Sequence, residues 1–122
     1  MSRAARSLLV FGIYLLLLGV ILVIAPKPVL ALFHMQAAGA VWVRVVGMLV
    51  CFLGCYYAMA ARCELKPFFQ WSVPIRALTI LFFGTFAILN WVTPEVVVIG
   101  VVDIAGALWT WMALRADRRA EM

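Results

Sequence analysis

Four long apolar segments, separated by short stretches that carry most of the charged residues, form the main pattern of the chain. They cover residues 8–25, 40–61, 75–92 and 96–114. The first holds 18 residues without a charge. A helix of that length measures about 27 Å, enough to cross a hydrocarbon core of roughly 30 Å. The pattern therefore predicts an all-α polytopic membrane protein, a single domain with four transmembrane helices in an up-down-up-down bundle.

Prolines mark the breaks between these segments. Pro26 and Pro28 are expected to end the first helix, because proline cannot continue a helix without losing a hydrogen bond. Residues 29–39 are apolar but too short to span, which predicts a short amphipathic segment along the interface. Ser72 can cap the third helix and Pro74 fits its first turn, which predicts that this helix begins at residue 75.

The two ends of the chain are charged. A basic leader with Arg3 and Arg6 precedes the first helix. We interpret this helix as retained rather than as a signal peptide, because it is long and Val23 stands where a cleavage site needs a small residue. Residues 115–122 are expected to fray as a polar tail.

Small and polar residues recur at steps of three and four in two of the helices, which predicts that these faces point into the bundle. In the second helix they are Arg44, Gly47, Cys51, Gly54, Cys55 and Ala58, and in the fourth Gly100, Asp103, Gly106, Ala107 and Thr110.

Composition supports the membrane interpretation. Hydrophobic residues make up 68% of the chain and charged residues 12%. Soluble domains are about 45–50% apolar and about 25% charged. The net charge of +5 comes from bases at helix ends rather than along one polar face, so a nucleic-acid partner is not expected.

The distribution of basic residues predicts the orientation. If both termini are cytoplasmic, eight of the ten Lys and Arg residues lie inside and only Lys27 and Arg44 lie outside. The tryptophans agree with this arrangement, because Trp42 and Trp91 fall at outer helix ends and the other three near inner ends.

Arg44 and Asp103 are charged residues inside apolar runs, where insertion of either costs about 2.5–3.5 kcal/mol. Each is expected to need a partner, so we predict that they meet across the bundle interior. One interpretation is a structural ion pair that fixes helix register, which we favour. The other is an intramembrane polar site for an ion, proton or small ligand, widened by Tyr14 and Asn90.

Basic and aromatic residues are expected to gather at the inner helix ends. Such a rim would anchor the protein to anionic lipid headgroups or dock a partner protein. Its predicted members are Arg62, Lys66, Trp71, Arg76, Arg115, Arg118 and Arg119.

The sequence offers no pattern that predicts catalysis. It contains no nucleophile with a plausible base and no glycine-rich phosphate loop, so an enzyme, a metal site and a cofactor are not expected. Cys51 and Cys55 lie four apart on one helix, a spacing that suits a disulfide poorly. His34 is the single histidine, without neighbours that could complete a metal site.

Several short motifs carry a family resemblance. They are Pro26-Lys27-Pro28 with Leu32-Phe33, Arg44-Val45-Val46-Gly47, Tyr56-Tyr57 before Ala61-Arg62, Lys66-Pro67-Phe68-Phe69 with Trp71, and Val102-Asp103 through Gly106 to Trp109-Thr110-Trp111. Their order resembles the BphX-like family of small bacterial four-helix integral membrane proteins of unassigned activity. The resemblance implies a bacterial inner (plasma) membrane and supplies no substrate.

The leading hypothesis is a small non-enzymatic membrane protein, an accessory or interaction subunit. The partners left open are membrane lipids, a second copy in a homodimer and a larger membrane protein. The alternative is a small transporter or ligand-binding bundle that uses the polar site around Arg44 and Asp103. A third hypothesis is a redox component acting through Cys51 and Cys55.

Overall fold

A computed structural model describes residues 1–34 and 39–121, and its regular structure is helical throughout these ranges. The helices are α1 (Arg3–Ile24), α2 (Pro26–Leu32), α3 (Ala40–Arg62), α4 (Lys66–Ile88) and α5 (Val97–Glu121), with a 3-10 turn, η2 (Pro94–Val96), before α5. Four of them, with η2 continuing into α5, are long and apolar enough to cross a membrane. The prediction of an all-α protein with four transmembrane helices is confirmed.

The predicted start of the third long helix is wrong. Helix α4 begins at Lys66 rather than at residue 75, with Pro67 in its first turn, where a missing N–H costs no hydrogen bond. Ser72 is no cap, because its hydroxyl donates to the Phe69 carbonyl of the preceding turn at 2.8 Å. Pro74 therefore lies inside the helix, which membrane helices tolerate.

Other helix ends also differ from the prediction. Ser2 caps α1, which therefore starts at Arg3 instead of residue 8. Helix α5 continues to Glu121, so the predicted frayed tail is helical as far as the structure describes it. Pro26 begins the short helix α2 instead of only ending α1. Of the predicted interfacial segment 29–39, residues 35–38 lie outside the described residues.

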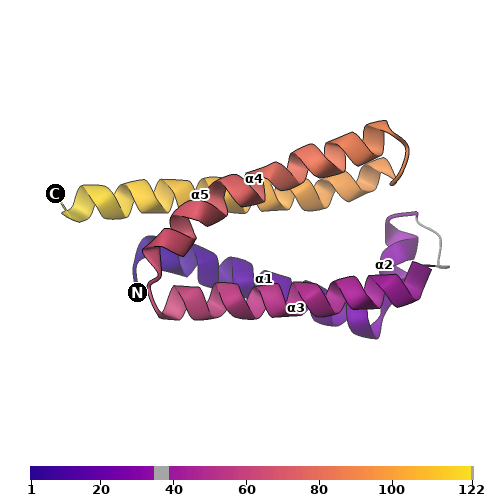
Figure 1. Cartoon of the computed structure of the whole chain (residues 1–122), viewed down its shortest axis with the longest axis horizontal. Coiled ribbons are helices and arrows are strands. Elements are labelled where there is room, and N and C mark those ends of the chain that lie inside the picture. The colour runs from indigo at the N-terminus through magenta and orange to yellow at the C-terminus, as the bar shows by residue number, and fades with distance from the viewer. Residues whose placement is uncertain (35–38, 122) are drawn as a thin grey trace.

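The long helices form two antiparallel hairpins, α1–α3 and α4–α5 (Figure 1). The hairpins pack on each other mainly through α1 and α5. Both chain ends lie at one end of the molecule, here the termini end, whereas α2 lies at the opposite end, here the loop end (Figure 1). Toward the loop end the two hairpins diverge (Figure 1).

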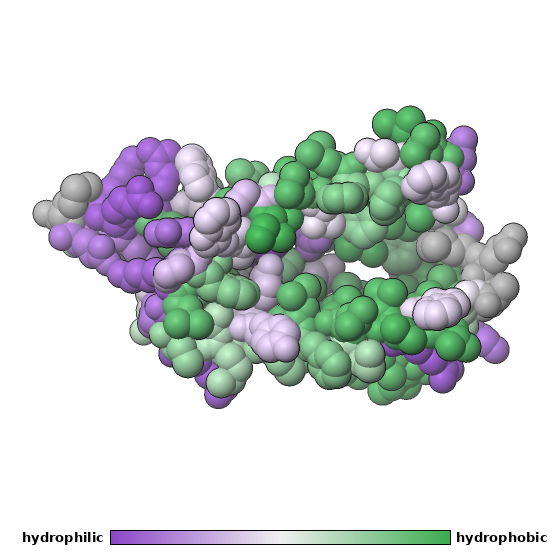
Figure 2. Space-filling model, in the orientation of Figure 1, coloured by the Kyte–Doolittle hydropathy of each residue, from purple (hydrophilic) through white to green (hydrophobic). Residues whose placement is uncertain are grey.

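The core lies in the half of the bundle that is nearer the termini end. Its buried members are Ala4, Ala5, Leu8, Phe11, Leu15, Tyr57, Ala60, Ala61, Phe69 and Ala113. Along the helices the visible surface is mainly hydrophobic, and hydrophilic residues gather at the termini end (Figure 2). This is the surface that a bilayer requires of a spanning bundle.

Glycines bring α1 and α3 into close contact. A Cβ atom at Gly12 would stand 3.0 Å from the Gly54 carbonyl oxygen, and one at Gly19 would stand 2.7 Å from that of Gly47. The small face predicted for the second long helix is therefore an interior face at Gly47 and Gly54, where it packs on α1. Arg44 lies one turn beyond Gly47, where α1 ends, and is exposed.

Candidate functional site

Arg76 is a buried cation within the bundle, with 3% of its surface exposed. It lies ten residues after Lys66, about 15 Å along α4 from the start of that helix. The prediction that Arg76 belongs to an exposed rim is wrong. The reason is the early start of α4, which carries this residue from the helix end into the packed interior.

Three hydroxyl side chains, each from a different helix, form a hydrogen-bonded group at the Arg76 guanidinium. Its Nη2 donates to Thr110 Oγ1 at 2.5 Å and, more weakly, to Ser72 Oγ at 3.4 Å. Thr110 Oγ1 lies 2.8 Å from Ser7 Oγ, and the Ser7 hydroxyl donates to the Ala4 carbonyl at 2.7 Å. Since the one proton of Ser7 is used there, Thr110 is the donor to Ser7 and the acceptor from Arg76.

Aromatic rings cover the rest of the guanidinium. Arg76 Cζ lies 4.6 Å from the centre of the Phe11 ring and 5.7 Å from that of Tyr57, both within cation–π range. Arg76 Nη1 is buried and finds no hydrogen-bond partner among the described residues. It lies beside Gly106, where an added Cβ atom would stand 3.3 Å away.

Asp103 lies on α5, partly buried, in the same polar region. Its carboxyl group interacts electrostatically with Thr79 and Arg76 of α4. It also interacts with the hydroxyl groups of Tyr14 and Tyr57. Within the described ranges the one ion pair within 4.0 Å joins Lys66 to Glu121, so Arg76 and Asp103 form no direct ion pair. We use the name polar core for the set Ser7, Tyr14, Tyr57, Ser72, Arg76, Thr79, Asp103 and Thr110.

The predicted pairing of Arg44 with Asp103 is wrong. Arg44 is exposed on α3, and among the described residues α3 packs on α1 and α2 rather than on α5. Asn90 is also outside the site, exposed in the turn after α4 with a φ of 60°. Of the residues predicted to surround Asp103, the structure brings only Tyr14 to it.

Sequence reasoning missed Ser7 and Ser72 as members of the polar core. Their signal was available, because small polar residues inside apolar helices commonly make contacts between helices. Ser7 directly precedes the predicted first helix, residues 8–25, and Ser72 is predicted as a helix cap. Thr110 was placed correctly on an interior face, without its role as the link between Arg76 and Ser7.

Acidic side chains hold the first turn of α1 at the termini end. The Ser2 N–H and hydroxyl donate to the two Glu64 carboxylate oxygens at 2.6 and 2.8 Å. The amides of Arg3 and Ala4 donate to Asp117 at 3.3 and 3.0 Å. Carboxylates suit this position because the first turn of a helix has free N–H groups and a positive dipole end. The hydrogen bonds from Ser2 lower the pKa of Glu64 below its ordinary value of 4.5.

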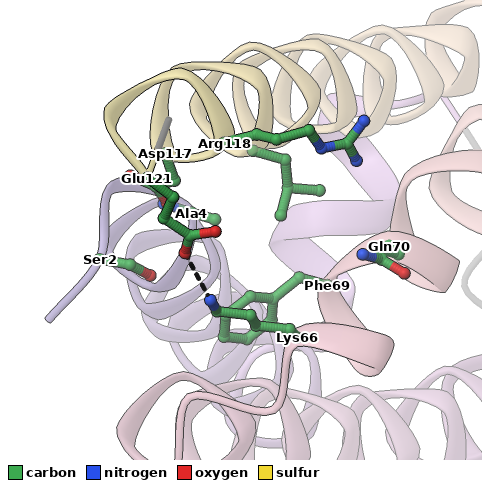
Figure 3. A pocket seen from close by; sticks show the side chains of 9 residues that line it. Ser2, Ala4, Lys66, Phe69, Gln70, Asp117, Arg118 and Glu121 are labelled. Atoms are coloured by element: carbon green, nitrogen blue, oxygen red, sulfur yellow. Dashed lines mark hydrogen bonds and ion pairs between the residues drawn. The ribbon is translucent and has the colours of Figure 1, made fainter.

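A small pocket opens beside these contacts. Lys66 reaches across it to Glu121, with Nζ and Oε1 2.8 Å apart, as the dashed line in Figure 3 shows. The remaining predicted rim residues, Arg62, Trp71, Arg115, Arg118 and Arg119, are exposed. Arg115 lies over the Trp111 ring, with Cζ 4.8 Å from its centre.

The described cysteines are free thiols. Cys51 packs against Gly19 of α1, and Cys55 is exposed. Within residues 1–34 and 39–121, no cluster of three His, Cys, Asp or Glu side chains is positioned to hold a metal ion.

No family model, curated protein or solved structure matches the chain. The resemblance to the BphX-like family therefore stays a prediction.

Proposed function

We propose that the protein is a small non-enzymatic integral membrane subunit that acts by packing α4 against another membrane chain. The proposed setting is the bacterial inner membrane, with both termini in the cytoplasm. The partner is either a second copy of this chain or a larger membrane protein.

Gly84 on α4 carries this proposal. Six of the seven glycines inside the long helices lie at crowded positions, where an added Cβ atom would meet a neighbouring helix. Gly84 is the exception, because apart from its chain neighbours and the nearby backbone of α4 no described atom lies within 4 Å of that position. In membranes, small residues allow two helix backbones to approach closely, so Gly84 offers a contact that the chain itself does not use.

The surroundings of Gly84 fit the same role. The buried residues of α4, Phe69, Ser72 and Arg76, all lie in its first half. In the second half, large apolar side chains such as Leu81, Phe82 and Ile88 are exposed. Ile80 and Phe83 in this half pack beside Gly100 of α5, whereas the exposed face is free to receive another helix.

A site-specific crosslinking experiment tests the proposal. Benzoyl-phenylalanine is placed at Leu81 of α4 and, as a control, at Leu17 of α1, which are exposed to nearly the same extent, 63% and 61%. Irradiation of native membranes should give one adduct of defined mass from position 81 and none from position 17. Twice the mass of the chain would identify a second copy, and any other defined mass a different partner.

The variant Gly84→Leu tests whether the close approach of a partner helix at Gly84 is needed for crosslinking. The open space at Gly84 leaves the fold of the chain itself unchanged, so the variant should insert and unfold like the parent while the adduct from position 81 disappears. An adduct that survives Gly84→Leu, or equal adducts from positions 81 and 17, would contradict the proposed role.

The distribution of charge supports the proposed orientation. Because Arg76 is buried, it is not counted among the basic residues at the termini end, and seven remain there. These are Arg3, Arg6, Arg62, Lys66, Arg115, Arg118 and Arg119. Against them stand Lys27 and Arg44 of the opposite end, an asymmetry that the positive-inside rule associates with cytoplasmic termini.

A second candidate function is binding of a small anion in the polar core. It is favoured by Arg76 Nη1, a buried charged donor without a described partner. A thermal-shift series with chloride, acetate and inorganic phosphate tests it. Binding would raise the midpoint with one anion in the parent protein and not in Arg76→Gln, whereas no anion-specific shift would exclude these three ligands.

A further inference from the structure

Two surface grooves follow the contact between α1 and α5. The groove nearer the termini end is lined by Arg3, Arg6, Trp109, Met112, Ala113 and Ala116. The second groove is lined by Val10, Phe11, Tyr14, Val102, Ala105, Gly106 and Trp109. Because Trp109 lines both, the two grooves are adjacent along α1 and α5, with two arginines at one end. Together they are here called the α1–α5 groove.

The charged end of the α1–α5 groove is free to bind an anion. Arg3 and Arg6 are exposed, and neither forms an ion pair with an acid in the described part of the chain. The Asp117 carboxylate, at the same end of the bundle, accepts hydrogen bonds from the backbone amides of Arg3 and Ala4. Each of its oxygens accepts one of these amide hydrogen bonds and pairs with neither guanidinium group in the described part of the chain, so the two guanidinium groups remain available. Paired guanidinium groups suit phosphate oxygens.

The other end of the groove is apolar because of small residues on α5. Ala105 and Gly106 leave the surface hollow beside Phe11, with Val10 and Val102 on its sides. From Arg6 to Tyr14 the groove follows eight residues of α1, about 12 Å at about 1.5 Å per residue. That length matches the upper part of an acyl chain below a headgroup.

We propose that the α1–α5 groove binds one anionic phospholipid from the leaflet that faces the termini end. Its phosphate lies between Arg3 and Arg6, and one acyl chain follows the groove past Trp109 toward Tyr14. This order of side chains fits a ligand that is charged at one end and hydrocarbon along the rest. A soluble anion would leave the apolar half of the groove unfilled. The site is separate from Gly84 and does not depend on a partner at α4.

Fluorescence of Trp109 tests this lipid site. Trp42, Trp71, Trp91 and Trp111 are changed to Phe, which leaves Trp109 as the single tryptophan, excited selectively over the tyrosines. The protein is reconstituted in phosphatidylcholine vesicles with a minor fraction of phosphatidylglycerol that carries brominated acyl chains, which quench on contact. We expect local enrichment over brominated phosphatidylcholine of about fivefold if one arginine engages the phosphate and of about thirtyfold if both do, at about 1 kcal/mol per basic residue.

Three variants separate a site from general attraction to the surface. Arg3→Gln with Arg6→Gln should reduce quenching to the phosphatidylcholine level. Arg62→Gln with Arg119→Gln removes two charges from the same end outside the groove and should leave the enrichment intact. Ala105→Phe fills the apolar half from an exposed position and should also abolish it with both arginines present.

Equal quenching by the two brominated lipids in the parent protein would overturn the proposal. Equal losses of enrichment in the two double-arginine variants would also overturn it, because they would show that general surface charge, and not a site, attracts the lipid. Gly84→Leu should leave the enrichment unchanged, so this result is independent of the crosslinking experiment.

Discussion

Ser7 of α1 and Thr110 of α5 share a hydrogen bond of 2.8 Å that joins the two helical hairpins. Thr110 at the same time accepts a hydrogen bond from Arg76 of α4. The contact between hairpins, which runs mainly through α1 and α5, therefore has a polar link inside its apolar packing. Hydroxyls and aromatic rings therefore hold the buried Arg76 guanidinium at the contact between the hairpins, while its Nη1 has no described hydrogen-bond partner.

Thr110→Val should destabilise the fold. The change keeps the shape of the side chain but removes the acceptor of Arg76 and the donor to Ser7, which should cost about 1–3 kcal/mol. Thermal unfolding in detergent measures the loss. The matched control is Thr85→Val, because the exposed Thr85 hydroxyl donates only to Leu81 within α4. Equal midpoints for the two variants would show that the link contributes nothing.

Gly54→Ala should lower the stability of the fold, whereas Gly84→Ala should leave it unchanged or raise it. A Cβ atom at Gly54 would lie 2.9 Å from the Gly12 carbonyl oxygen, and overpacking of this kind costs about 1–3 kcal/mol. At Gly84 the same atom meets no described neighbour within 4 Å. That change should be neutral or raise stability, because alanine favours the helix over glycine by about 1 kcal/mol. Unchanged or raised stability of Gly54→Ala in detergent would mean that the α1–α3 crossing is not close-packed.

Hydrophobic pattern predicted the number of helices because each apolar run is long enough to span and each break contains proline or charge. It misplaced the start of α4 because Pro67 and Pro74 both satisfy the rule for a first turn. The choice depends on packing between helices, since the earlier start brings Phe69 and Arg76 into contact with α1 and α5. Local sequence does not contain this information.

The pattern of small residues predicted faces but not partners. Gly47 and Gly54 do line a crossing, yet the helix that fills it is α1. Arg44 and Arg76 are each single charges in apolar surroundings, and only the position of the neighbouring helix ends decides which is buried. Arg44 lies beyond the end of α1, whereas Arg76 faces Phe11 in its middle.

Glu64 should make stability sensitive to acid. Its pKa in the folded protein lies below the ordinary value of 4.5, chiefly because the Ser2 amide donates to it. Its contribution is therefore complete above that ordinary value and is lost as the pH falls through the lower, folded value. Glu64→Gln should flatten the decline in unfolding midpoint below about pH 4.5, relative to the parent protein. Glu95→Gln, an exposed acid at the other end, should leave the decline unchanged. Parallel curves for all three proteins would contradict this role.

Labelling of single cysteines should report the proposed orientation. In a background without Cys51, Cys55 and Cys63, cysteines placed at Lys27 or Glu95 should react with impermeant maleimide added to intact cells. Cysteines at Lys66 or Arg118 should react only after lysis. The reason is the surplus of basic residues at the termini end, which resists export. The reverse pattern would place both termini outside.

Asp103 should be coupled energetically to Arg76 and not to Arg44. Arg76 interacts electrostatically with the Asp103 carboxyl group. Arg44 is exposed on α3, which does not pack on α5 in the described residues. Removing the Arg76 charge leaves the carboxylate without a compensating charge in a region of low dielectric, which costs more than removing both.

Two double-mutant cycles in detergent measure this difference. Asp103→Asn with Arg76→Gln should lose less stability than the sum of the single changes, by about 0.5–3 kcal/mol. Asp103→Asn with Arg44→Gln should be additive within about 0.5 kcal/mol. The second cycle is the matched control, because it removes the same two charge types from the same chain. Coupling in the Arg44 cycle would mean that α3 and α5 approach each other in the membrane. Additivity in both cycles would mean that Asp103 is neutral or solvated where it lies, and that Arg76 is held by Thr110, Ser72 and the aromatic rings alone.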